Sequence, residues 1–217
     1  VFDQSHEVHI LVVDDNSPDE TALKVELYQS KYLGRLFLLK RNGKHGLGTA
    51  YVEGFKWCLK RDYEFVFEMD ADFSHDPKDL KRLYAVCKED NIDLAIGSRY
   101  IQGVNVVNWP LSRVLLSYTA SLYVRLITGM NILDPTAGFV CYRRETLEKI
   151  NLDQIKFIGY AFQIEMKYIT YRNKFIIKEV PIIFTDRIRG ASKLSKGIIG
   201  EAIFGVLQMR LKIILGN

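Results

Sequence analysis

Short apolar runs alternate with segments of helical spacing through the first hundred residues. The apolar runs occupy residues 8–13, 36–39, 65–69 and 94–96. The segments that repeat apolar residues with a helical period lie at 19–31, 46–60 and 77–89. This alternation predicts an α/β fold with a mostly parallel sheet and helices on both faces. Ligands in such folds bind beyond the carboxyl ends of the strands.

The pattern changes after about residue 100. There it predicts a helix over 112–128, a short strand over 139–142, a helix over 160–172, strands around 175–185 and a final helix. No internal repeat, low-complexity tract or linker divides the chain. We therefore expect one domain over residues 1–196, followed by an amphipathic helix over 197–217.

The composition of 217 residues, 48% hydrophobic and 26% charged, fits one globular domain. The net charge of +4 is modest, but cationic residues concentrate late in the chain, at Arg187, Arg189, Lys193, Lys196, Arg210 and Lys212. A local basic patch of this kind suits phosphates or an anionic membrane surface, and a solvated charged face is the ordinary alternative. We expect no nucleic-acid partner.

The cysteines and the apolar segments bear on the compartment. Cys58, Cys87 and Cys141 form neither a disulfide framework nor a metal-binding pair, which predicts buried, reduced thiols in the cytosol. No signal peptide opens the chain, and no apolar run reaches the roughly 20 residues of a membrane span. The stretch 197–215 is interrupted by charges, which predicts a helix that packs on the domain or lies on a membrane.

The most informative motif follows the apolar run at 65–69. Asp70 and Asp72 are separated by one residue, so on a strand their side chains share a face and can converge on one hard cation. Such a cation would hold a diphosphate. Asp is also a common turn former at strand ends, so the motif by itself is weak.

Two further segments follow predicted strands. Asp14 and Asp15 come directly after the first one and could accept hydrogen bonds from a nucleotide, although a helix cap at Ser17 or Asp19 is an alternative. Residues 41–54 form a glycine-rich loop that opens a helix, where backbone N–H groups around Gly46 and Gly48 can approach an anion. The loop has neither the Walker A nor the dinucleotide fingerprint, which argues against an ATPase or a dehydrogenase.

Taken in order, a series of motifs resembles that of the dolichol-phosphate mannosyltransferases. The motifs are DDNSPD (14–19), GLGTA (46–50), MDAD (69–72), GSRY (97–100), DPTAGF (134–139), FTDR (184–187) and GASKL (190–194). This family belongs to the inverting glycosyltransferases with the GT-A fold. The resemblance covers nearly the whole chain, and it implies a GT-A-type, Rossmann-like domain.

The resemblance implies transfer of mannose from GDP-mannose to the phosphate of a dolichol or another polyprenol, with inversion. No histidine or carboxylate pair clearly supplies a general base, and His45 and His75 are expected in surface or supporting roles. A phosphate acceptor needs none, because its second pKa of about 6 leaves it ionised near neutral pH. Mg²⁺ or Mn²⁺ would bridge the donor diphosphate.

The same resemblance assigns the site residues. Asp70 and Asp72 would bind the metal, with Ser74 at a place where some relatives carry a third ligand. Arg99 and Arg113 would hold the lipid phosphate, for which guanidinium groups are suited. The remaining assignments are Asp134, Gln163 and Glu165 to the sugar or acceptor pocket, Asp14, Asp15, Gly46 and Gly48 to the nucleotide, and Arg187, Ser192 and Lys193 to a loop that closes over the diphosphate.

Two questions stay open in the sequence. The chain begins at Val1 and has no counterpart of the family's first strand, so we expect a fragment whose donor pocket lacks one wall. The alternatives are a UDP-glucose-dependent enzyme, transfer to a hydroxyl acceptor, or a non-catalytic subunit that binds a nucleotide sugar.

Because the acceptor stays in a bilayer, we expect peripheral association with the cytoplasmic side of a membrane, through the last helix or an anchoring subunit.

Overall fold

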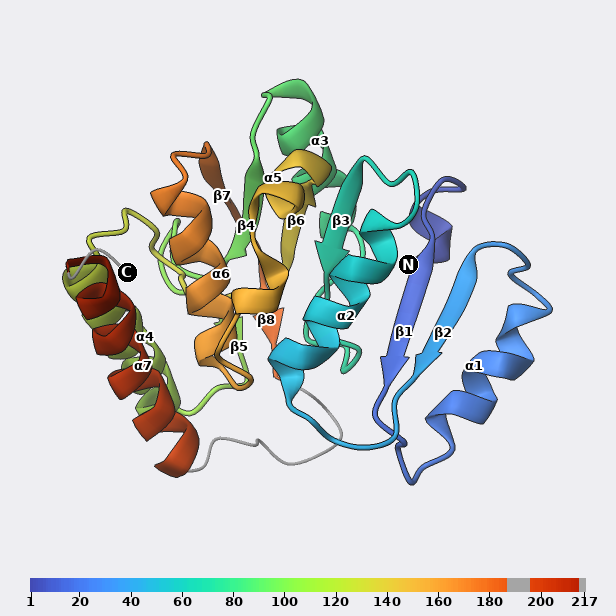
Figure 1. The fold of residues 1–217 in the computed structure, drawn as a ribbon, viewed down its shortest axis with the longest axis horizontal. Coiled ribbons are helices and arrows are strands. Elements are labelled where there is room, and N and C mark those ends of the chain that lie inside the picture. The colour runs from blue at the N-terminus through green and yellow to red at the C-terminus, as the bar shows by residue number, and fades with distance from the viewer. Residues whose placement is uncertain (187–195, 215–217) are drawn as a thin grey trace.

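The computed structural model describes residues 1–186 and 196–214. Its strands form three groups (Figure 1). The first pairs β1 (Ile10–Asp14) with β2 (Leu36–Lys40) in parallel. The second is a four-stranded sheet in the order β3 (Phe65–Glu68), β6 (Val140–Arg143), β4 (Leu94–Ser98) and β7 (Ile177–Pro181). The third pairs β5 (Val106–Val107) with β8 (Phe184–Thr185) in parallel.

The four-stranded sheet is mixed. Strands β3 and β4 both run antiparallel to β6, and β7 runs parallel to β4, so β3, β4 and β7 share one direction. The reversed strand of this sheet is β6, which lies between β3 and β4. It is reached through the long helix α4 (Leu111–Thr128) and a loop. The expected α/β architecture is confirmed, and the position of β6 is a detail that periodicity does not give.

The helices agree closely with the predicted segments. They are α1 (Thr21–Gln29), α2 (Leu47–Leu59), α3 (Asp79–Glu89), α4 (Leu111–Thr128), α5 (Arg144–Lys149), α6 (Ala161–Arg172) and α7 (Lys196–Ile214), with short 3₁₀ turns at Phe2–Gln4 and Leu152–Gln154. The sequence analysis did not predict α5 and β5, which have six and two residues. Segments this short do not contain a recognisable hydrophobic period. In Figure 1, α4 and α7 lie side by side at one end of the molecule.

Strand alternation divides the core into two clusters. In β4, Leu94 and Ile96 pack in one cluster with residues of α6 such as Phe162. Ala95 points to the opposite face, where it packs with Leu83 of α3. Both faces of this strand are therefore buried, which fixes its register and hence the position of the residues that follow it.

Helix α2 packs closely against the segment before α6 because Gly48 has no side chain. A Cβ placed at Gly48 would lie 2.4 Å from the carbonyl oxygen of Phe157 and 2.9 Å from the Phe162 ring. Gly54, in the same helix, has ordinary van der Waals space, since the nearest atom would lie 3.7 Å away. The two glycines thus differ in how closely a neighbour approaches.

We expect Gly48→Ala to lower the free energy of unfolding by about 1–3 kcal/mol, because the methyl group would force backbone apart. Gly54→Ala is the matched control, and it should be neutral or stabilising by up to about 1 kcal/mol through helix propensity. Urea unfolding of both variants measures the difference. Equal effects at the two positions would contradict the packing argument.

Candidate active site

The turn after β3 carries Asp70 and Asp72 at the carboxyl end of the strand. The Asp72 carboxylate accepts hydrogen bonds from the Ser74 backbone N–H at 3.1 Å and from the Ser74 hydroxyl at 2.5 Å. Ser74 is buried. The serine that the resemblance offered as a third metal ligand therefore orients the Asp72 carboxylate in this structure.

Asp70 is supported from two sides. Its backbone N–H donates to Nδ1 of His75 at 3.3 Å, and the Tyr51 hydroxyl lies 3.5 Å from one of its carboxylate oxygens. Burial lowers the pKa of His75 to about 4, so the imidazole is neutral and Nδ1 can accept. Burial, reinforced by the neighbouring carboxylates, raises the pKa of Tyr51, so its hydroxyl keeps its proton. His75 is buried, so the expected surface role is wrong and a supporting role fits.

The oxygen donors of this turn fit a hard divalent cation. Mg²⁺ and Mn²⁺ prefer carboxylate oxygens, and Asp70 and Asp72 provide them. Across residues 1–186 and 196–214, no group of three His, Cys, Asp or Glu side chains is arranged to hold a metal. A cation here would have to complete its coordination with oxygens from elsewhere, such as those of a diphosphate or water.

Arg99 and Asp134 form a buried, bidentate ion pair. Nε and Nη2 of Arg99 donate to the two Asp134 oxygens at 2.7 and 2.6 Å, and the Arg99 backbone N–H adds a third bond at 3.0 Å. Thr136 accepts from the same Nη2 at 2.8 Å. Burial alone would raise the pKa of Asp134, but Arg99 outweighs it and lowers that pKa, so the pair is ionic.

Arg113 lies in the first turn of α4 and faces the same region. It donates to the Asp186 carboxylate at 2.8 Å, and its guanidinium lies 4.1 Å from the centre of the Trp109 ring. The Arg99 guanidinium lies 5.5 Å from the centre of that ring and 5.6 Å from that of Phe184. Both arginines assigned to the acceptor phosphate are therefore gathered around one indole.

Strand β8 joins the carboxylate turn to the arginines. The Thr185 N–H donates to the Ser74 carbonyl at 3.2 Å, and the Asp186 N–H donates to the Val107 carbonyl at 3.0 Å. Since Asp186 also binds Arg113, the turn with Asp72 and the start of α4 meet at this strand. Segments that are far apart in the sequence thus form one site.

The residues assigned to the nucleotide lie around Arg41, which the sequence analysis missed. Arg41 is buried and binds Asp15 through two bonds of 2.6 and 2.8 Å, and it also donates to Glu53 at 3.1 Å. Asp14 is buried and accepts from the Ser17 N–H at 3.2 Å. A cavity of about 280 Å³ adjoins Asp14 and Arg41. Asp15 is thus fixed by a cation of the protein itself.

The glycine-rich loop has a different reason for its glycines. The Gly48 N–H, which the sequence offered to an anion, donates to the Ile158 carbonyl at 2.9 Å. Gly46 has φ of 98°, and a Cβ there would lie 2.8 Å from the same carbonyl. Both glycines permit close packing, so the anion role expected of Gly48 is not the one this structure gives it.

Gln163 and Glu165, assigned to the sugar pocket, make internal contacts. Nε2 of Gln163 donates to the Glu68 carboxylate at 2.5 Å. Glu165 accepts from the backbone N–H groups of Lys156 and Phe157, each at 3.0 Å. Both side chains are buried. Arg187, Ser192 and Lys193 lie outside the described residues.

Three buried or half-buried charged groups support the site and were not identified from the sequence. They are Glu68 in β3, Lys167 in α6 and Glu179 in β7. Burial raises the pKa of Glu68 to about 7 and lowers that of Lys167 to about 8. A charged residue inside an otherwise apolar segment is the signal that could have found them.

Comparison with known proteins identifies the family of the chain. Residues 1–151 match the family described as "Glycosyl transferase family 2". The chain is 46% identical over 206 residues to the polyprenol monophosphomannose synthase of Mycolicibacterium smegmatis, covering 95% of this chain and 77% of that protein. It is 45% identical over 205 residues to the undecaprenyl-phosphate mannosyltransferase of Micrococcus luteus, covering 94% and 83%.

Solved structures show the same fold at lower identity. Glucosyl-3-phosphoglycerate synthase from Mycobacterium tuberculosis, in complex with Mn²⁺, UDP and glucosyl-3-phosphoglycerate, superposes with a TM-score of 0.64 at 17% identity, covering 93% of this chain and 68% of that one. The GT-A-type fold expected from the resemblance is confirmed. With a family match over most of its length and two relatives above 40% identity, the chain belongs to glycosyl transferase family 2.

Proposed function

We propose that this chain transfers mannose from GDP-mannose to the phosphate of a polyprenol, with inversion at the anomeric carbon. The observation that carries the proposal is the meeting, around β8, of a carboxylate turn suited to a diphosphate-bound cation and two arginines suited to a phosphate. The names of the two relatives point to the same acceptor chemistry. The product would be polyprenyl-phosphate mannose.

The proposed reaction needs no side chain to remove a proton. A polyprenyl phosphate is largely a dianion near neutral pH, since its second pKa is about 6. One of its oxygens forms a bond to the anomeric carbon while the bond from that carbon to the GDP diphosphate breaks, and GDP leaves with the electron pair. Attack from the face opposite the leaving group inverts the configuration. The neutral, buried His75 is consistent with catalysis that does not use a base.

The protein's task is to bring two anions together. Arg99 and Arg113, each already paired with a carboxylate, would donate hydrogen bonds to the acceptor phosphate, and their placement beside one indole would let the phosphate reach both. Asp70 and Asp72 would hold Mg²⁺ or Mn²⁺, which supplies electrostatic stabilisation to the leaving diphosphate. Asp14, Asp15 and Arg41 would form the nucleotide side.

The lipid chain of the acceptor supplies the reason for an apolar surface beside the site. Helices α4 and α7 pack together and expose large apolar side chains, at Leu111, Leu115, Leu116, Leu122, Leu126, Ile203, Phe204, Leu207 and Leu211. None of the described helices has the length and hydropathy needed to cross a bilayer. We assign this surface, called here the α4/α7 face, to contact with the cytoplasmic side of a membrane, either directly or beside an anchoring subunit.

Transfer of labelled sugar to a short polyprenyl phosphate in detergent tests the proposal, with GDP-mannose and UDP-glucose compared in parallel. We expect lipid-linked mannose that requires Mg²⁺ or Mn²⁺ and disappears with EDTA. A glucose product would show that the donor is UDP-glucose, and the proposed acceptor would stay the same. Binding of a nucleotide sugar without transfer to the lipid would show that the chain is a binding subunit and not an enzyme.

Asp72→Asn should lower the metal-dependent rate by roughly 1000-fold, because the cation contributes several kcal/mol of stabilisation to the leaving group. Asp62→Asn is the matched control, since Asp62 is exposed and precedes the other end of β3. Its rate should stay within about twofold. An equal loss in both variants would show a general effect of the substitution, and an active Asp72→Asn would remove the metal from the proposal.

Binding to vesicles that contain an anionic phospholipid tests the α4/α7 face. The double variant Leu115→Asp and Phe204→Asp should weaken sedimentation with vesicles at least about tenfold, because it places two charges on the apolar surface. Leu33→Asp, at an exposed position outside this face, is the control and should bind as the parent does. Parent-level binding by the double variant would contradict the assignment.

A further inference from the structure

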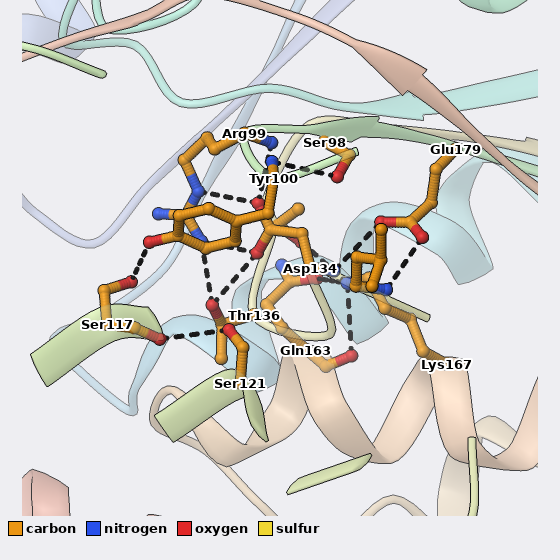
Figure 2. A network of polar contacts seen from close by, with 12 residues as sticks. Ser98, Arg99, Tyr100, Ser117, Ser121, Asp134, Thr136, Gln163, Lys167 and Glu179 are labelled. Atoms are coloured by element: carbon orange, nitrogen blue, oxygen red, sulfur yellow. Dashed lines mark hydrogen bonds and ion pairs between the residues drawn. The ribbon is translucent and has the colours of Figure 1, made fainter. Parts of the chain in front are cut away.

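We infer that Lys167 is a positioning residue that fixes Arg99 relative to the Asp70 turn. The inference rests on the proposed function for the role of Arg99. It adds a residue that would not touch the substrates, since Lys167 is fully buried. Figure 2 shows Lys167 reaching from α6 toward the loop that carries Asp134 and Thr136.

Three oxygen atoms surround the Lys167 ammonium. Its Nζ donates to the Ala137 carbonyl at 2.6 Å, to the Gln163 side-chain oxygen at 3.1 Å and to the Gln163 carbonyl at 3.2 Å. These bonds use all three of its donor hydrogens. The ammonium therefore has one defined position, and it links two parts of the chain that are far apart in sequence.

One arm of this link leads to the metal side. Because Gln163 presents its oxygen to Lys167, its amide nitrogen faces the Glu68 carboxylate, to which it donates at 2.5 Å. Glu68 is the last residue of β3, two positions before Asp70. Gly138 adjoins both arms of this link, since a Cβ there would lie 3.8 Å from the Gln163 amide nitrogen and 3.8 Å from the Asp70 carboxylate.

The other arm leads to the acceptor side. Ala137 belongs to the loop over residues 133–138, and Glu179 of β7 holds the opposite end by accepting from the N–H groups of Leu133 and Asp134 at 2.7 and 2.9 Å. Asp134, in the same loop, forms the bidentate ion pair with Arg99. Lys167 and Glu179 thus hold the loop at both ends, as the dashed contacts in Figure 2 show.

A charge at this position has a cost that packing alone would not require. Burial lowers the pKa of Lys167 to about 8 even though Glu68, Asp134 and Glu179 attract its cation. Methionine would fill similar space without that cost, but it would leave the Ala137 carbonyl and the Gln163 side-chain oxygen without this donor. Lys167→Met therefore removes the bonds and keeps most of the volume.

A double-mutant cycle on transfer tests whether Lys167 acts through Arg99. Lys167→Met should lower kcat/KM for polyprenyl phosphate by roughly 100-fold, the loss expected for a misplacement of about 1 Å. Arg99→Lys should show a loss of similar size. The double variant should lose at least about tenfold less than the product of the single losses, because the two changes disturb one contact chain. Losses that multiply would overturn the inference.

The indole of Trp109 gives a readout that does not depend on activity. The sequence has two tryptophans, and Trp57→Phe leaves only Trp109, beside which both acceptor-side guanidiniums lie. In that background Lys167→Met should shift the emission of Trp109 in the same direction as Arg99→Lys. The shift in the double variant should be smaller than the sum of the two single shifts. Unchanged emission would show that Lys167 does not position Arg99. If the emission shifts are not additive but the parent protein transfers no mannose, this inference stands and the proposed function is rejected.

Two further variants separate positioning from folding. Lys178→Met is the matched control, because Lys178 is an exposed lysine of β7 paired with Asp90, and it should change neither kcat/KM nor emission. Thermal unfolding shows whether each variant is folded. If Lys167→Met does not fold, Glu179→Gln takes its place in both cycles, since it weakens the grip on the same loop. Losses that multiply in the cycle with Glu179→Gln would likewise overturn the inference.

Discussion

The buried ion pair between Arg99 and Asp134 is the contact on which the proposed acceptor side of the site depends. Two charges removed from water are stable only when their geometry is good and their remaining hydrogen-bonding groups are satisfied. Here the Asp134 carboxylate accepts three bonds from Arg99, including one from its backbone, and Thr136 takes a further guanidinium hydrogen. The guanidinium that would meet the phosphate is therefore held in place before any ligand arrives.

This ion pair is itself held by charges behind it. Glu179 binds the backbone at the beginning of the Asp134 loop, and Lys167 binds the carbonyl near its end. Through Gln163, the same lysine reaches Glu68 and hence the strand that ends at the metal-side turn. These buried charges are thus satisfied by neutral groups, namely the backbone of the Asp134 loop and the Gln163 side chain, and through those groups they link the turn after β3 to Arg99.

Much of the fold could be predicted from the sequence because strands and helices differ in period. The strands β1 to β4 stand out as short apolar runs and α2 as a segment of helical spacing, whereas β6 is antiparallel for a topological reason that no local pattern carries. The site was predicted less completely. Asp70 and Asp72 could be found from their spacing, but Arg99, Arg113 and Asp134 were found only through the resemblance to a family.

The partners of those residues could not be predicted, because they depend on which segments meet in space. Arg99 and Asp134 are 35 positions apart, and nothing local pairs them. Gly48 shows the same limit in another way, since a glycine suited to an anion looks the same in a sequence as one where a Cβ would lie 2.4 Å from a carbonyl oxygen. Lys167 and Glu68 gave a weaker signal, as charged residues within apolar segments, and only the structure shows that they are linked.

Helix α4 connects the proposed chemistry to the proposed membrane contact. At about 100° per residue, Leu111, Leu115, Leu122 and Leu126 fall within an arc of roughly 60° on one side of the helix, and all four are exposed. Arg113 points about 200° away from Leu111, toward Trp109 and Asp186. The helix would therefore lie between Arg113 and the proposed bilayer surface. Because Arg113 lies in the first turn, the beginning of α4 is where a phosphate could reach it while the attached lipid remained on the apolar side.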